Sequence, residues 1–168
     1  MNKEELQKVL SDHDEWLKDN TKGKRANLTN ANLRNADLTE ANLINADLTN
    51  ADLTFANLSK ANLTNANLTR ANLSRANMSF ANLSKANLSN ANMSYANLTK
   101  ANMSYANLTK ANLTNANLFQ ADLTNADLCD ADLFHANLFH ADLRNADLSH
   151  ADLTDANIYI GNRKVIAP

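Results

Sequence analysis

The chain has 168 residues, a formal net charge of −2, and 44% hydrophobic but only 5% aromatic residues. Its 2 glycines exclude collagen, glycine-rich linkers and a phosphate-binding glycine loop, and its single cysteine excludes a disulfide framework or a zinc finger. No apolar run approaches the roughly 18 residues that a membrane-spanning helix needs. The charged N-terminal segment lacks the apolar stretch of a secretory signal, so we expect a cytoplasmic protein.

Residues 2–19 predict an amphipathic helix within an N-terminal segment of residues 1–25. Asn2 and Glu5 have the spacing of a capping box, and Gly23 suits the end of the connection that follows the helix. The apolar stripe that recurs at helical spacing contains Leu6, Val9, Leu10, Trp16 and Leu17, with His13 beside them. We expect this stripe to cover the open end of whatever follows, and a partner-binding helix is the alternative.

From Ala26 to Ile158 the sequence obeys one five-residue rule, A-(N/D)-L-(S/T)-x, through 27 repeats. A period of five suits neither an α-helix nor a continuous strand, since the apolar residues would not stay on one face. Within a repeat, however, Ala and Leu are two positions apart and share one face of a short extended segment. The chain must therefore turn once per repeat, at the polar pair that follows each Leu, such as Thr29 and Asn30. Repeated turns predict an all-β solenoid with stacked Leu and Ala inside.

The repeat resembles the A-(D/N)-L-x-x consensus of pentapeptide repeat proteins over residues 26–160, without an insertion. The resemblance implies a right-handed quadrilateral β-helix, with Leu and Ala pointing inward and an N-terminal α-helical cap. Four repeats per coil would give about 6.75 coils from the 27 repeats. The expected domains are thus the capping helix and connection (1–25), the β-helix (26–160) and a C-terminal tail (161–168).

Aromatic residues mark the C-terminal end as a candidate interface. A 20-residue coil would align Phe119, Phe139 and Tyr159 in one column, with Ile160 beside them, at a position where Ser or Thr is usual. The column is either an interface, covered by the tail or by a second subunit, or a stack within one chain. The family resemblance favours a homodimer through this end, because several members dimerise through a C-terminal region.

Charge divides the repeats along their length. Residues 53–121 contain six basic residues and no acid, and these basic residues scatter over all four expected faces, so we predict no direct nucleic-acid binding. The last coils carry a candidate acidic surface made of Asp122, Asp127, Asp130, Asp132, Asp142, Asp147, Asp152 and Asp155. These aspartates either hold their own turns or present negative charge to a basic partner. The expected columns lie on separate faces, which disfavours calcium.

We predict no catalytic activity and no cofactor. His135, His140 and His150 would lie apart, Cys129 is solitary, and Leu and Ala should fill the interior. The preferred function is a rigid scaffold for an unidentified protein partner, without membrane contact. The alternative, implied by the resemblance, is a DNA mimic that binds a type II topoisomerase such as DNA gyrase and protects it from quinolones or toxins. A consensus-like array with little selected surface function also fits the regularity.

Overall fold

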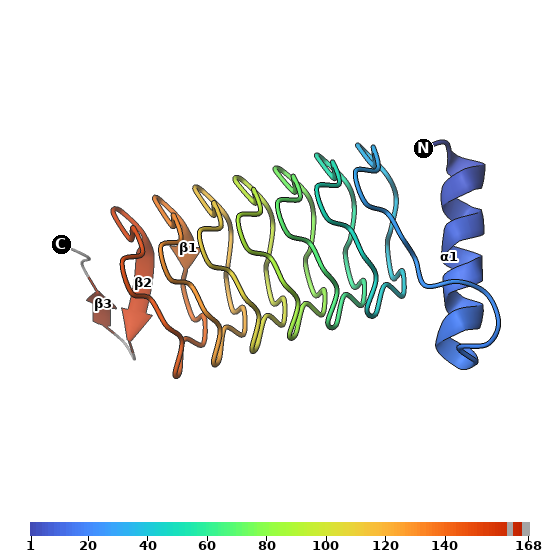
Figure 1. The fold of residues 1–168 in the computed structure, drawn as a ribbon. Coiled ribbons are helices and arrows are strands. Elements are labelled where there is room, and N and C mark those ends of the chain that lie inside the picture. Colours follow the sequence, from blue (N-terminus) through green and yellow to red (C-terminus); the bar gives the residue numbers. More distant parts are fainter. Residues whose placement is uncertain (161–162, 166–168) are drawn as a thin grey trace.

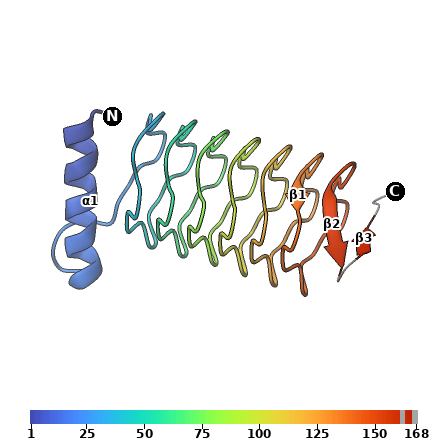
Figure 2. The ribbon, with the colours of Figure 1, turned by 180° about the vertical axis from the view of Figure 1, so that it is seen from behind.

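The computed structural model describes residues 1–160 and 163–165, with side chains described as far as Ile158. The chain forms a solenoid of stacked coils, with one α-helix across the N-terminal end and a short hairpin at the other end (Figure 1). The view from behind shows the same order of helix, coils and hairpin (Figure 2). This arrangement confirms the predicted β-helix with a single N-terminal helix.

Helix α1 spans Lys3–Lys18 and begins with the predicted capping box. Asn2 Oδ1 accepts the backbone N–H of Glu5 at 2.8 Å, and a Glu5 carboxylate oxygen accepts the backbone N–H of Asn2 at 2.9 Å. Leu6 is buried, and Val9 and Leu10 pack half-buried against the solenoid interior. Among the residues described, no helix is long and apolar enough to cross a membrane.

Each repeat contributes one parallel β-bridge to the repeat 20 residues later. The bridges run without interruption from Asn27 with Asp47 to Asp132 with Asp152. Each extended segment bonds to the next coil, as where Leu28 N–H donates to the Asp47 carbonyl at 2.7 Å and Asp47 N–H donates to the Ala26 carbonyl at 3.0 Å. Four five-residue repeats therefore separate hydrogen-bonded neighbours, which fixes one column of side chains for every 20 residues.

The corners are β-turns at the positions that the sequence predicted. Ala31 N–H donates to the Leu28 carbonyl at 3.0 Å, and this bond recurs in the following repeats. The fifth residue of the repeat has a positive φ of 55° to 60° from Asn30 to Asp155. A positive φ at only the third of four turn residues is the pattern of a type II turn, which favours Gly or Asn there. The solenoid nevertheless places Phe, Tyr, Lys and Arg at this position as well.

The interior is a continuous stack of Leu, Met and Ala. The Leu and Met side chains from Leu28 to Leu138 are at most 2% exposed. Burial decreases at the C-terminal end, where Leu143, Leu148 and Leu153 are only partly covered. Stacked coils bury one another's apolar side chains, so the two ends are where a solenoid needs a cover.

Three short strands form a sheet at the C-terminal end. Strand β1 (Asn137–Leu138) pairs in parallel with β2 (Asn157–Ile160), and β2 pairs antiparallel with β3 (Arg163–Val165). In the register of the hairpin Ile158 lies opposite Val165. Part of the predicted tail thus pairs with the last strand of the solenoid. The rest of the tail lies outside the described residues.

Candidate interaction faces

The second residue of nearly every repeat, Asn or Asp, holds its own turn through a local hydrogen bond. Asn57 Oδ1 accepts the backbone N–H of Ser59 at 3.1 Å, and Asp127 Oδ1 accepts that of Cys129 at 3.0 Å. This is the local bonding for which Asn and Asp are favoured in turns. Asn and Asp serve this purpose equally, so the choice between them determines the charge of each face without altering the fold.

One face carries an unbroken column of asparagine at this second position, and we call it the amide face. It consists of Asn57, Asn77, Asn97, Asn117, Asn137 and Asn157. The Nδ2 atoms of Asn77, Asn97 and Asn137 each donate to the Oδ1 atom of the asparagine in the preceding coil, over 3.0 to 3.2 Å. The amide face is therefore uncharged at its centre and is held in register by side-chain bonds as well as by the backbone.

Two corners flank the amide face, and both stack aromatic rings with cations. At the corner that precedes these repeats, the Arg75 guanidinium carbon lies 5.6 Å from the centroid of the Phe55 ring and 5.3 Å from that of Tyr95. We call this row the Arg75 corner. Such spacings are within the range of cation–π attraction, with the strongest effect where water is excluded.

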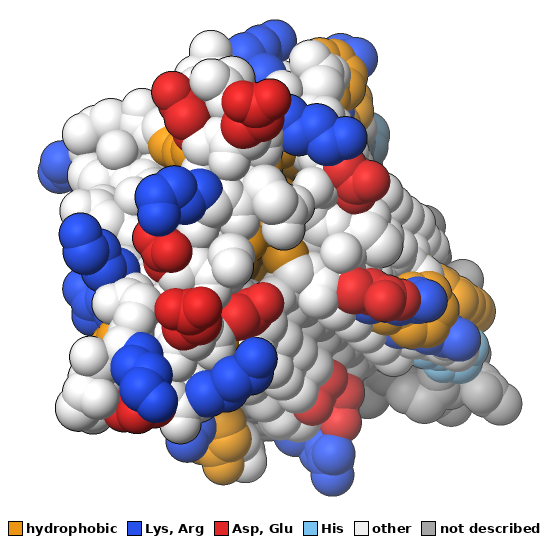
Figure 3. Space-filling model, turned by 90° about the vertical axis from the view of Figure 1, so that its right-hand side faces the viewer, with side chains coloured by type: hydrophobic (Ala, Val, Ile, Leu, Met, Phe, Trp, Pro, Cys, Tyr) orange, Lys and Arg blue, Asp and Glu red, His pale blue; other side chains and the backbone are white. Residues whose placement is uncertain are grey.

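The corner that follows the same repeats is the Lys100 corner, formed by Lys60, Phe80 and Lys100. Lys100 Nζ lies 5.4 Å from the centroid of the Phe80 ring. Lys60 Nζ forms an ion pair of 3.0 Å with a carboxylate oxygen of Glu40 in the preceding coil. Figure 3, which looks along the solenoid from the helix end, shows hydrophobic and basic side chains gathered on corners of the solenoid.

The exposed aromatic side chains are the feature that the sequence analysis missed. Phe55, Phe80, Tyr95 and Tyr105 are 48%, 56%, 57% and 61% exposed. All four are fifth residues of a repeat, and a 20-residue alignment of fifth positions would have placed Phe55, Arg75 and Tyr95 in one row. Phe55, Phe80 and Tyr95 flank the amide face, whereas Tyr105 lies on another corner.

Near the C-terminal end the predicted aromatic column lies at the edge of the amide face. The rings of Phe119 and Phe139 are stacked, with centroids 6.0 Å apart and planes 11° apart, and His140 meets Phe139 edge-on at 4.1 Å. Both phenylalanines are half-buried, so they are less open to solvent than the sequence suggested. The side chains of Tyr159 and Ile160 lie outside the described part, and their place in the candidate interface stays a prediction.

The acidic residues of the last coils occupy the other faces and two corners. The bridges pair Asp122 with Asp142, Asp127 with Asp147, and Asp132 with Asp152, each pair on a different face. Asp130 and Asp155 lie at corners, where His135 Nε2 is 3.7 Å from an Asp155 carboxylate oxygen. The structure thus distributes the acidic surface around the solenoid.

Local hydrogen bonds lower the pKa of several of these carboxylates. The side chain of Arg144 lowers the pKa of Asp142, to which it donates from Nε and Nη2. The hydroxyl and backbone N–H of Ser149 lower the pKa of Asp147, and those of Thr154 lower the pKa of Asp152. These aspartates therefore serve the turns and present charge at the same time.

Cysteine and histidine offer little reactive chemistry. Cys129 is a free thiol whose pKa is raised by burial, then by the charges of Asp130, Asp147 and Asp127, which makes the nucleophilic thiolate scarce. Within residues 1–158, no group of three or more His, Cys, Asp and Glu side chains is arranged to hold a metal ion.

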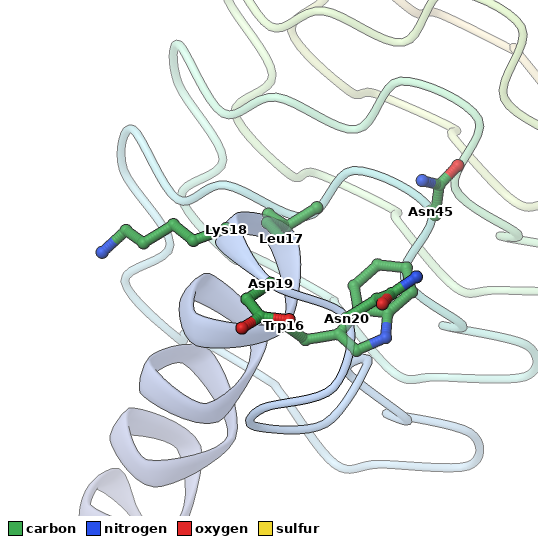
Figure 4. A pocket seen from close by; sticks show the side chains of 6 residues that line it. All are labelled: Trp16, Leu17, Lys18, Asp19, Asn20 and Asn45. Atoms are coloured by element: carbon green, nitrogen blue, oxygen red, sulfur yellow. The ribbon is translucent and has the colours of Figure 1, made fainter.

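The junction of helix and solenoid contains a buried histidine. His13 is fully buried, and its Nδ1 accepts the backbone N–H of Ala26 at 3.0 Å. Its ring stacks on Trp16 with centroids 5.6 Å apart. Beside it, an open hollow of about 630 Å³ lies between the end of α1 and Asn45 of the solenoid, lined mainly by Trp16, Leu17 and polar groups (Figure 4). The hollow forms because helix α1 does not cover the whole end of the solenoid. Its lining residues do not form a cluster of reactive side chains.

The chain has five-residue repeats, parallel bridges between coils and an N-terminal capping helix. These features place it in the class of solenoid repeat proteins. The family model described as pentapeptide repeats matches residues 24–54, 51–90, 96–133, 111–148 and 131–159. The chain belongs to the pentapeptide repeat family.

Solved structures of the family show the same fold. The chain is 40% identical to HetL, a pentapeptide repeat protein involved in heterocyst differentiation regulation from the cyanobacterium Nostoc sp. strain PCC 7120, with a TM-score of 0.78. That match covers 79% of this chain and 62% of HetL, so the chain spans less than two thirds of HetL. Rfr23 from the cyanobacterium Cyanothece 51142 is 38% identical with a TM-score of 0.52, over 54% of this chain and 62% of Rfr23. No curated protein matches the sequence significantly.

Proposed function

We propose that the chain is a rigid, non-catalytic scaffold that binds a protein partner through the amide face and its two corners. The main support is a group of exposed aromatic rings at these corners, Phe55, Phe80 and Tyr95. The other outward side chains of the solenoid are mostly small, carboxamide-bearing or charged. Aromatic and arginine side chains are enriched at protein interfaces and supply much of their binding energy.

The proposal includes a right-handed solenoid of about 6.75 coils, as 27 repeats in a 20-residue register imply. Such a scaffold has little conformational entropy to lose on binding, because ladder hydrogen bonds already fix the backbone of each coil. The involvement of HetL in the regulation of heterocyst differentiation supports a partner-binding rather than a chemical role here. A single free cysteine fits the reducing cytoplasm.

Affinity capture from the native host with matched baits tests this function. The Phe80→Asn/Tyr95→Asn variant removes two rings at the amide face, and Asn suits the positive φ of both positions. Tyr105→Asn removes an equally exposed ring from another corner and serves as the control. We expect a protein that the wild-type and control baits retain and the double variant loses. Identical captured proteins for all three baits would contradict the use of this face.

We also propose that two copies associate through the C-terminal end. The partly covered Leu143, Leu148 and Leu153 support this, because an uncovered solenoid end exposes apolar surface. Light scattering on wild type and Phe139→Asp gives the test, with a dimer that becomes a monomer as the expected result. A monomeric wild type, or an unchanged mass for the folded variant, would contradict it.

A topoisomerase contact is the second candidate, favoured only by the paired aspartate columns of the last coils. A gyrase supercoiling assay with and without a fluoroquinolone decides this point. No effect at micromolar concentrations of the protein would end the DNA-mimic hypothesis.

A further inference from the structure

We infer that the amide face binds an acidic protein segment, whose carboxylates contact the Arg75 and Lys100 corners. This inference rests on the proposed function and names the chemistry of the partner. Residues 53–121 contain no carboxylate and carry six cations at the corners, so that three cations flank each of the four faces. Those beside the amide face are Lys60, Arg75 and Lys100.

The amide face differs from the other three faces toward the C-terminal end. Each of those faces carries a pair of aspartates at the second repeat position, but the amide face continues with Asn117, Asn137 and Asn157. Between residues 55 and 120 an acidic segment lying along it would meet cations at the corners and neutral amides at the centre, whereas Asp37, Glu40 and Asp155 lie on the same rows toward the ends. The same segment on any other face would approach a column of like charge, which is unfavourable.

The geometry of the rings favours carboxylates over stacking ligands. A cation that lies over a ring in the next coil sets the ring plane across the solenoid axis, so the ring edge is directed outward. The edge of an aromatic ring carries the positive end of its quadrupole. The π faces that Phe55 and Tyr95 turn toward Arg75 are already covered by the guanidinium. Bases and sugars, which stack on open π faces, therefore find one face of each of these two rings already occupied.

The number of cations also separates an acidic protein from a nucleic acid. Nucleic-acid affinity grows with the number of phosphates neutralised. The amide face offers three cations, of which Lys60 is already paired with Glu40. Arg75 combines a guanidinium fork, suited to a bidentate carboxylate contact, with two flanking rings, which is the composition of an interface hot spot.

The test measures binding of the full chain to fluorescein-labelled poly-L-glutamate of about 20 residues, by fluorescence anisotropy at about 0.1 M salt. The variant is Arg75→Gln/Lys100→Gln. The matched control is Arg70→Gln/Lys85→Gln, which removes the same charge from fifth repeat positions on the other two corners. Gln120 already occupies such a position with a φ of 55°, so glutamine is compatible with the turn. Circular dichroism melts establish that both variants fold.

We expect at least a fivefold increase in Kd for Arg75→Gln/Lys100→Gln and less than a twofold change for the control. Equal weakening by both variants would overturn the inference, because binding would then be non-specific attraction to the whole basic section. Absence of poly-L-glutamate binding would also overturn it, as would tighter binding of an oligothymidylate of the same length. The capture experiment distinguishes failure of the proposed scaffold function from failure of the acidic-segment inference. A partner lost by Phe80→Asn/Tyr95→Asn but retained by Arg75→Gln/Lys100→Gln leaves the scaffold function standing and refutes the acidic segment.

Discussion

Protonation of His13 should release the N-terminal helix from the solenoid. Nδ1 accepts the Ala26 N–H, so the neutral ring carries its proton on Nε2, and a second proton would have to displace the Ala26 bond. Burial lowers the pKa of His13, although the Ile44 carbonyl and the charge of Asp14 act in the opposite direction. The neutral form is therefore the form that the folded junction requires.

The sign and size of the pH effect follow from this lowered pKa. Above pH 6.5 the ring is neutral in both the folded and unfolded chain, and stability does not change on its account. As the pH falls below 6.5, the unfolded chain binds a proton that the folded chain does not, and the free energy of unfolding decreases by up to about 1.4 kcal/mol per pH unit. At pH 5.0 the loss is at most about 2 kcal/mol, and it stops growing below the pKa of the folded state.

His13→Phe isolates the hydrogen bond from the packing. Phenylalanine retains an aromatic ring against Trp16 but leaves the buried Ala26 N–H without an acceptor, which costs about 1–3 kcal/mol, offset in part because the buried His13 Nε2–H, which has no hydrogen-bond partner, is removed as well. Urea titrations at pH 7.5 and 5.0, followed by the fluorescence of Trp16, the single tryptophan, measure both effects. We expect the free energy of unfolding of the wild type to fall between pH 7.5 and pH 5.0. His13→Phe should have a lower free energy of unfolding than wild type at pH 7.5, and it should not fall further at pH 5.0. His150→Asn changes an exposed histidine at a positive φ, so its stability at pH 7.5 can rise slightly, but its loss of stability between pH 7.5 and 5.0 should equal that of wild type. A pH-independent wild type, or a fully stable His13→Phe, would refute the reasoning.

Three further predictions concern the solenoid itself. Leu88→Ala removes a fully buried side chain in the middle of the stack and should cost about 2–5 kcal/mol in a urea titration; a cost below 1 kcal/mol would mean that the interior collapses around the cavity. Lys110→Asn should raise the stability by roughly 0.5–1 kcal/mol, because φ is 58° there and asparagine tolerates this region better than lysine; an unchanged melting temperature would contradict that assignment of strain. Because Ser149 lowers the pKa of Asp147, the stability that this carboxylate contributes is present above about pH 4 and decreases as the pH falls through the lower pKa of the folded state. Asp147→Asn should therefore flatten the acid limb of a pH–stability curve below pH 4, and an acid limb identical to that of wild type would show that Asp147 does not contribute.

The five-residue rule by itself determined the solenoid, the inward Leu and Ala and the place of the turns, and the spacing of Asn2 and Glu5 determined the capping box of α1. A period of five cannot keep Ala and Leu on one face unless the chain turns in each repeat, so no other regular backbone satisfies the pattern. The charge division along the chain was equally visible, since it needs only the order of residues such as Lys110 and Asp122.

The 20-residue register and the surface rows were decided by the tertiary structure. Period alone leaves the number of repeats per coil open, and the bridges of Asn57 with Asn77 and of Asn77 with Asn97 bring Phe55, Arg75 and Tyr95 into one corner. The positive φ of these corner residues contradicts their own preferences. Ladder bonds to the neighbouring coils hold each corner in place, as where Arg75 N–H donates to the Ser94 carbonyl at 2.9 Å. Composition and period therefore set the interior, where one rule serves every repeat, while the outer surface depends on which side chains the coil brings together.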